Sequence, residues 1–98
     1  MEKMKIKWLA KAKEDFENEL KRIAEEAGRP VAVKLYRLIE KYEETLVKFP
    51  NSGRPGQIAE TRELVITGFP YIMPYRVKNG VVEILRFFHT SQNPPNRW

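Results

Sequence analysis

Residues 61–88, TRELVITGFPYIMPYRVKNGVVEILRFF, determine the fold that we predict. Three runs in this stretch are rich in β-branched and aromatic residues, as strands are: residues 61–66, 71–77 and 82–88. Turn-forming residues separate the runs at 67–70 and at Asn79-Gly80, and an Asn-Gly pair is the strongest short signal for a two-residue hairpin loop. We therefore predict an antiparallel meander of three strands.

A two-residue loop at Asn79-Gly80 fixes which residues of the hairpin lie opposite each other. It would pair Arg76 with Glu83, which is a favourable cross-strand ion pair. It would also place Pro74 at a hydrogen-bonded position, and proline has no amide hydrogen to donate. Pro74 therefore either marks a bulge or turns its nitrogen toward a sheet edge, and the sequence leaves both open.

The sequence before this meander has the period of helices. From Leu9 onward, apolar residues recur three or four positions apart, which is the pattern of an amphipathic helix, and Gly28 is a natural terminator. Pro30 suits the first turn of a second helix, which runs to about Pro50. Two helices joined by so short a connection form an antiparallel hairpin. Residues 4–9 alternate apolar and charged side chains, as a half-buried strand does.

The predicted architecture is α+β, with the order strand, helix, helix and three strands. An antiparallel helical hairpin packs on one face of a small, mainly antiparallel sheet, and the N-terminal strand joins an edge of that sheet in an undetermined direction. Residues 51–60 are dense in turn formers and are predicted to form a loop. The 98 residues are expected to form a single domain, residues 1–98, because two would each have too small a core.

Composition excludes several classes of function. The chain has no cysteine and one histidine, so disulfides are excluded and no metal or other cofactor is expected. Phosphate-loop and dinucleotide-binding glycine motifs are absent. No secretory signal and no apolar run of membrane-spanning length occurs, so we expect a cytoplasmic protein without a membrane partner.

The positive charge predicts an anionic partner. The net charge is +5, and from residue 49 onward six basic residues, five of them arginines, stand against three acidic ones. Arginine presents a planar fork of donors that suits phosphate and carboxylate groups. Nucleic acid or an acidic protein segment would fit, and the alternative is a basic protein whose arginines form structural ion pairs.

Four residues are candidates for function. His89 follows the last predicted strand, where working residues are common, although a histidine that closes the sheet by hydrogen bonds is the alternative. Arg62, Arg76 and Arg86 lie on three consecutive predicted strands, which the sheet should bring close together. Arg76 has a structural partner in Glu83. Arg86 stands between apolar neighbours, so it requires either an acidic partner or an opening in the structure.

Taken together, these motifs resemble the RelE/ParE superfamily of toxins. The resemblance extends over nearly the whole chain and rests on the order and spacing of residues 53–56 (GRPG), 61–65 (TRELV), 70–72 (PYI), 75–77 (YRV), 83–86 (EILR) and 89–92 (HTSQ).

The resemblance implies the toxin of a type II toxin–antitoxin module, held inactive in a hetero-oligomer by a cognate antitoxin. Some members cut messenger RNA on the ribosome, and others inhibit DNA gyrase. Members that cut RNA use basic residues on the sheet and a histidine or tyrosine near the C-terminus. By motif, Arg62, Arg86 and His89 match such catalytic residues.

The sequence also departs from the RNA-cutting members. A further basic residue that they often carry at the start of the third strand is missing, as are the clustered lysines that some have on the second. The pattern favours messenger-RNA cleavage first and inhibition of DNA gyrase almost equally. A third possibility is an RNA- or protein-binding domain without toxicity.

Overall fold

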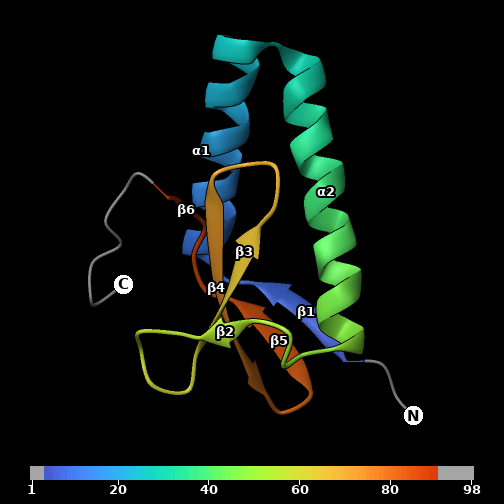
Figure 1. Cartoon of the computed structure of the whole chain (residues 1–98), viewed down its shortest axis with the longest axis vertical. Coiled ribbons are helices and arrows are strands. Elements are labelled where there is room, and N and C mark those ends of the chain that lie inside the picture. The colour runs from blue at the N-terminus through green and yellow to red at the C-terminus, as the bar shows by residue number, and fades with distance from the viewer. Residues whose placement is uncertain (1–3, 91–98) are drawn as a thin grey trace.

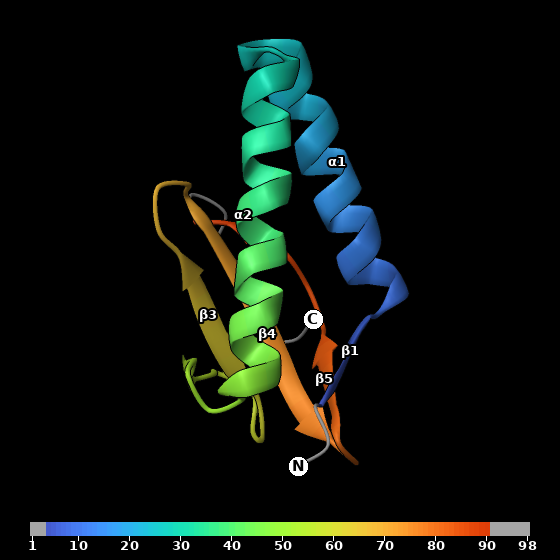
Figure 2. The same cartoon turned by 90° about the vertical axis from the view of Figure 1, so that its right-hand side faces the viewer.

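Two helices lie side by side on one face of a mixed sheet in the computed structural model, which describes residues 4–90 (Figure 1). In chain order the elements are β1 (Lys5–Trp8), α1 (Ala10–Ala27), α2 (Arg29–Lys48), β2 (Arg54–Pro55), β3 (Arg62–Ile66), β4 (Tyr71–Lys78), β5 (Val81–Ile84) and β6 (Phe88–His89). The predicted α+β architecture, with its helical hairpin on one face of the sheet, is confirmed (Figure 2).

The sheet has the order β1-β5-β4-β3-β2, with β6 paired to β4 beyond the end of β5. All pairings are antiparallel except that of β1 with β5, which is parallel. This answers the question of direction that the sequence left open. The short strand β2 lies inside the segment that we expected to be a loop throughout, so that expectation was wrong for two residues.

The two helices begin and end close to the positions that the sequence predicted. Gly28 has φ of 98°, a conformation that favours glycine, and it ends α1 while allowing α2 to begin at the next residue. Pro30 lies in the first turn of α2. No helix within residues 4–90 is long and apolar enough to span a membrane.

The core lies between the helices and the sheet. Both helices contribute the apolar stripe seen in the sequence, and the strands contribute alternate residues. Its fully buried members include Leu35 and Ile39 of α2 and Tyr71, Met73 and Tyr75 of β4. The aromatic residues Tyr71, Tyr75, Phe87 and Phe88 are also buried.

The hairpin at Asn79-Gly80 has the predicted register. Arg76 lies opposite Glu83, and the Arg76 Nε to Glu83 Oε1 distance is 2.6 Å. The third strand of the meander is not continuous, however, because β5 ends at Ile84 and β6 starts only at Phe88.

Pro74 explains this break. The Leu85 amide donates to the Pro74 carbonyl at 2.9 Å, so the proline nitrogen faces the same neighbouring strand and has no hydrogen to return. Ile84 lies opposite Tyr75 and Phe88 opposite Ile72, so residues 85–87 span the length of only residues 73–74 on β4. The extra residue makes a bulge, which is the first of the two possibilities that the sequence allowed.

Candidate functional site

The Arg86 guanidinium is held by an aspartate of α1. Its Nε donates to Asp15 Oδ2 at 2.7 Å, and its Nη2 donates to Asp15 Oδ1 at 3.1 Å. The backbone amide of Phe87 donates to the same carboxylate at 3.1 Å, and the Arg86 guanidinium carbon lies 4.8 Å from the centre of the Phe88 ring. Both charged side chains are about one-fifth exposed. Of the two possibilities predicted for Arg86, the acidic partner is therefore present.

The bulge also places Arg86 at the wall of a cavity of about 440 Å³. Arg76 and Lys11 share this wall, and residues 58–61 close it from the side of the loop before β3. The sheet thus brings Arg76 and Arg86 to one cavity, as expected of neighbouring strands. Both arginines already have carboxylate partners, in Glu83 and Asp15.

Arg62 does not line this cavity. Its Nη1 donates to the Gly53 carbonyl at 2.8 Å and to the Asn51 carbonyl at 3.3 Å. The Tyr75 hydroxyl, opposite Arg62 in the sheet, binds the same loop by accepting from the Gly53 amide at 2.9 Å and donating to the Pro50 carbonyl at 2.7 Å. Arg62 therefore fastens the loop that follows α2.

His89 lies in β6, at the end of the meander as predicted, directly opposite Tyr71 of β4. The edge of one ring meets the face of the other, with the ring centres 5.3 Å apart and an interplanar angle of 88°. His89 is also near enough to Glu19 to contribute to the lowered pKa of that carboxyl.

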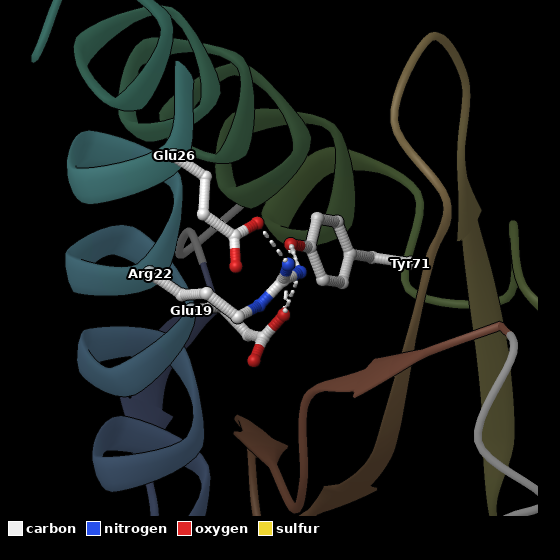
Figure 3. Close-up of polar contacts among 4 residues, drawn as sticks. All are labelled: Glu19, Arg22, Glu26 and Tyr71. Carbon is white, nitrogen blue, oxygen red and sulfur yellow. Dashed lines mark hydrogen bonds and ion pairs between the residues drawn. The ribbon is translucent and has the colours of Figure 1, made fainter. Parts of the chain in front are cut away.

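Tyr71 joins His89 to a polar cluster on α1, shown in Figure 3. The Tyr71 hydroxyl donates to Glu19 Oε1 at 2.9 Å and lies 3.3 Å from Arg22 Nη2, which donates to it. The same Arg22 nitrogen donates to Glu19 at 2.8 Å, and Arg22 Nη1 donates to Glu26 at 2.9 Å. The hydroxyl of the buried Tyr71 thus has both a hydrogen-bond acceptor, Glu19, and a hydrogen-bond donor, Arg22, on α1.

The cluster shifts the acidity of its members. Burial, together with the hydrogen bond to the Glu19 carboxylate, raises the pKa of Tyr71 to about 12. Burial acts to raise the pKa of Glu19, but hydrogen bonds from Arg22 and Tyr71 outweigh it and the pKa lies below its ordinary value. Tyr71 therefore stays protonated and Glu19 ionised at neutral pH.

The three predicted catalytic residues lie in different surroundings. Arg62 is opposite Tyr75 and His89 is opposite Tyr71, on the two sides of β4. Four residues of strand separate those positions, which is about 14 Å at the usual rise of a strand. A catalytic role for Arg62, Arg86 and His89 stays a prediction.

Sequence reasoning did not identify the α1 residues that contact these candidates. Asp15 precedes the buried Phe16 by one position, and Glu19 follows it by three, so both flank the apolar stripe of α1. A polar residue at the border of such a stripe is near enough to the sheet to reach a buried polar group there. Their position beside the apolar stripe is the feature of the sequence that could have identified Asp15 and Glu19. It does not indicate which polar group each carboxylate contacts.

A second hollow, of about 420 Å³, lies between α1 and α2 beside the end of β1. Its aromatic lining includes Trp8, Phe16 and Tyr36. The ring centres of Trp8 and Phe16 are 5.2 Å apart, and those of Phe16 and Tyr36 are 6.2 Å apart. Tyr36 is 51% exposed. We call this hollow the aromatic groove.

Three glutamates also line the aromatic groove: Glu17, Glu40 and Glu43. Trp8 Nε1 donates to Glu43 Oε2 at 3.1 Å. Burial raises the pKa of Glu43 despite this hydrogen bond, and the nearby Glu40 adds to the shift. The groove therefore combines an apolar lining with three acidic side chains and one basic one, Lys13.

No three acidic or histidine side chains within residues 4–90 lie close enough together to hold a metal ion.

Comparisons with known proteins give one consistent result. The family described as "ParE toxin of type II toxin-antitoxin system, parDE" matches residues 6–94. A protein of Sinorhizobium fredii described as a candidate toxin, Y4kP, is 36% identical over 95 residues, which cover 97% of each chain. A solved structure of the chromosomal ParDE system from P. aeruginosa has a TM-score of 0.80 and 28% identity, over 88% of this chain and 95% of that one. A conserved protein of Helicobacter pylori shares the fold at 20% identity, with a TM-score of 0.58 over 91% of this chain and 97% of that one.

Proposed function

Since the chain belongs to the ParE toxin family of type II toxin–antitoxin systems, we propose that it arrests growth by inhibiting DNA gyrase rather than by cutting messenger RNA. The chain is the toxin of its module, and its partner is a cognate antitoxin. The sequence alone favoured RNA cleavage first and gyrase inhibition almost equally, and the contacts of the candidate residues support the opposite order.

The observation that carries the proposal is the pairing of Arg86 with Asp15. An arginine that stabilises charge on a scissile phosphate must direct its donors at the substrate. Here two nitrogens of Arg86 donate to Asp15, whose negative charge would also repel a phosphate.

The other two candidates support the same conclusion. Arg62 donates to backbone carbonyls of the loop after α2, and His89 packs against Tyr71 about 14 Å away along β4. General acid–base catalysis requires groups within hydrogen-bond reach of the same reacting atoms. A toxin that acts by binding gyrase needs no such convergence.

One observation favours the second candidate, a ribosome-associated ribonuclease. The wall of the cavity beside the bulge has three cationic side chains, Lys11, Arg76 and Arg86, against one carboxylate, Glu60, and such an excess of positive charge suits a backbone phosphate. In that case Arg62, Arg86 and His89 would be the catalytic residues to test.

The two candidates differ in what they require of His89. In cells that express the toxin without its antitoxin, we would measure double-strand breaks in DNA and cleavage of messenger RNA within ribosome-bound codons. With the purified toxin, we would measure supercoiling by purified gyrase. The wild-type protein and His89→Gln, which keeps polarity and approximate size, would be compared at equal folded concentration.

For a gyrase inhibitor, both proteins should inhibit supercoiling and cause breaks while RNA stays intact. RNA cleavage that His89→Gln lowers by about 100- to 10,000-fold, without breaks, would establish the ribonuclease instead. If neither the wild-type protein nor His89→Gln affects growth, the proposal that the chain arrests growth is wrong. Co-expression with the neighbouring antitoxin should relieve the arrest in the first two cases.

A further inference from the structure

The net positive charge of the chain lies outside its two helices. Residues 10–48, which are both helices and the glycine between them, hold nine lysines and arginines and nine acidic side chains, so they add nothing to the net charge of +5. The other residues that the structure describes, 4–9 and 49–90, hold seven lysines and arginines and three acidic side chains. The sheet and its loops therefore carry the positive charge.

Four of these basic residues lie on the face of the sheet away from the helices. On β1, Lys5 and Lys7 alternate with residues that pack against the core. On β4, Arg76 follows the buried Tyr75, and Lys78 is two positions further along the same strand. We call Lys5, Lys7, Arg76 and Lys78 the basic patch.

The register of the sheet brings the four residues of the basic patch together. Strand β5 lies between β1 and β4. A lysine of β1 and a basic residue of β4 therefore lie on the two sides of Glu83, and again on the two sides of Val81. Residues on one face of a strand are about 7 Å apart, and two strand spacings are about 10 Å. The four positive charges thus occupy a surface of roughly that size.

One carboxylate, that of Glu83, lies among them. Arg76 Nε donates to Glu83 Oε1 at 2.6 Å. This hydrogen bond, with the positive charges of Arg76 and of two lysines of the patch, holds the pKa of Glu83 below its ordinary value. Within residues 4–90, none of Lys5, Lys7 and Lys78 forms an ion pair. Three of the four positive charges are therefore available to a ligand.

The surroundings of the basic patch do not reverse its charge. Arg76 borders the cavity beside the bulge, whose wall adds Lys11 and Arg86 against the carboxylate of Glu60. Arg86 itself is paired with Asp15. The basic side chains next to the patch therefore balance the acidic ones, and the patch keeps its excess of positive charge.

The phosphates of a nucleic-acid duplex fit this surface better than a protein segment does. Protein interfaces depend on aromatic or other large anchors in well-packed pockets, and the patch has only charged side chains around Val81. Duplex DNA carries one negative charge per about 1.7 Å of its axis, so a surface about 10 Å across meets several phosphates.

The same face is poorly suited to single-stranded RNA. Proteins bind single strands largely by stacking the bases on aromatic side chains. No aromatic ring belongs to the basic patch. Phe88, which lies opposite Ile72 on this face of the sheet, is only 7% exposed. A ligand that presents its backbone rather than its bases is therefore favoured.

We propose that the basic patch binds the phosphate backbone of duplex DNA without reading its sequence. Lysine and arginine side chains that contact phosphates fix the position of a protein on DNA but carry no sequence information. The choice of DNA rests on the proposed function, because gyrase acts on duplex DNA. On a DNA segment held by gyrase, the toxin contacts the DNA as well as the enzyme.

The first test measures the affinity of the free full-length toxin for a labelled duplex of about 30 base pairs, at salt concentrations from about 50 to 200 mM. Contacts with about four phosphates predict a fall in affinity of about 100-fold over this range. Duplexes of unrelated sequence should bind equally well, since only the backbone is contacted.

The second test removes two charges of the patch. The double variant Lys5→Gln and Lys78→Gln leaves the ion pair of Arg76 in place. At about 100 mM salt it should bind the duplex at least about tenfold more weakly, and the slope of log affinity against log salt should fall in magnitude by about two.

The matched control is the double variant Lys21→Gln and Lys34→Gln, which changes the net charge by the same amount. Lys21 lies in the second half of α1 and Lys34 in the first half of α2. This end of the helical hairpin is far from the turn between β4 and β5 (Figure 1). The control should change the affinity by less than about threefold. Urea unfolding curves would show that both double variants are folded.

The outcomes separate this inference from the proposed function. A toxin that inhibits gyrase but does not bind the duplex at the lowest salt concentration would overturn the inference and leave the proposed function intact. Equal weakening by both double variants would also overturn it, because net charge rather than the patch would then determine the affinity. Tighter binding of single-stranded RNA than of the duplex would overturn it in favour of RNA. Duplex binding with the expected effects, by a toxin that does not inhibit gyrase, would support the patch and overturn the proposed function.

Discussion

Three donors converge on the carboxylate of Asp15: two from the guanidinium of Arg86 and one from the Phe87 amide. The bulge at residues 85–87 turns Arg86 toward α1, and Asp15 holds it there. From the sequence, Arg86 was expected to need an acidic partner. Which carboxylate it would be was beyond sequence reasoning, because Asp15 is 71 positions away along the chain.

Removing the charge of Asp15 should destabilise the protein. Asp15→Asn keeps the size of the side chain but leaves a largely buried guanidinium without its counter-charge, and we expect a loss of about 2–3 kcal/mol in the free energy of unfolding. Urea denaturation measures it. The matched control is Arg54→Gln, which removes the pair of Glu63 with an arginine whose side chain is 57% exposed and should cost less than about 1 kcal/mol. Equal losses in the two variants would show that the Asp15 contact stabilises no more than a surface pair.

Tyr71 should make stability fall in strongly alkaline solution. The pKa of Tyr71 is raised to about 12 in the folded protein from its ordinary value of 10.0, so its contribution to stability is fully present below pH 10 and is lost as the pH rises toward 12. Tyr71→Phe should lower the free energy of unfolding by about 1–2 kcal/mol at neutral pH and flatten this alkaline decline. The measurement is unfolding free energy against pH, with Tyr36→Phe, at an exposed ring, as the control. An unchanged alkaline decline in Tyr71→Phe would assign it to other groups.

At the scale of elements, sequence patterns predicted what local chemistry specifies. The helix pattern, Gly28 and Pro30 located the helical hairpin, and Asn79-Gly80 fixed the register at Arg76 and Glu83. The bulge between β5 and β6 was only one of two possibilities for Pro74. The sequence does not show whether the nitrogen of Pro74 faces a neighbouring strand or a sheet edge, and only the first arrangement interrupts a strand. Strand β2 was missed because two residues in a segment of turn formers carry no periodic signal.

The loop between α2 and β3 depends on a close approach to β4. A Cβ atom added at Gly53 would lie 2.7 Å from both Cε1 and the hydroxyl oxygen of Tyr75 and 2.9 Å from the Glu63 carbonyl oxygen. Gly53→Ala should therefore push the loop from Tyr75 and cost about 1–3 kcal/mol in the free energy of unfolding.

Limited proteolysis would locate the effect of that change. Cleavage between residues 50 and 56 should accelerate in Gly53→Ala but not in Gly80→Ala, where an added Cβ meets nothing within 4 Å and only the positive φ of 74° opposes it. Unaltered cleavage of the loop in Gly53→Ala would show that the contact with Tyr75 is not what holds it.

At the scale of the whole molecule, one core connects both helices with the central strands of the sheet. We propose that the chain unfolds as a single unit, as the length of the sequence suggested. Helix content by circular dichroism and the fluorescence of Trp8, measured in a Trp98→Phe background, should then have coincident midpoints in denaturant. Separate midpoints would mean that the helical hairpin and the sheet are independent.

The parallel pairing of β1 with β5 has a consequence for the order in which the toxin matures. Lys5 lies opposite Val81, so β1 cannot pair with β5 until the intervening residues, which include both helices and strands β2 to β4, have been made. Contacts so distant in sequence form slowly, and partly folded chains expose unpaired strand edges in the meantime. The sheet therefore acquires its final form only after Val81 has been translated.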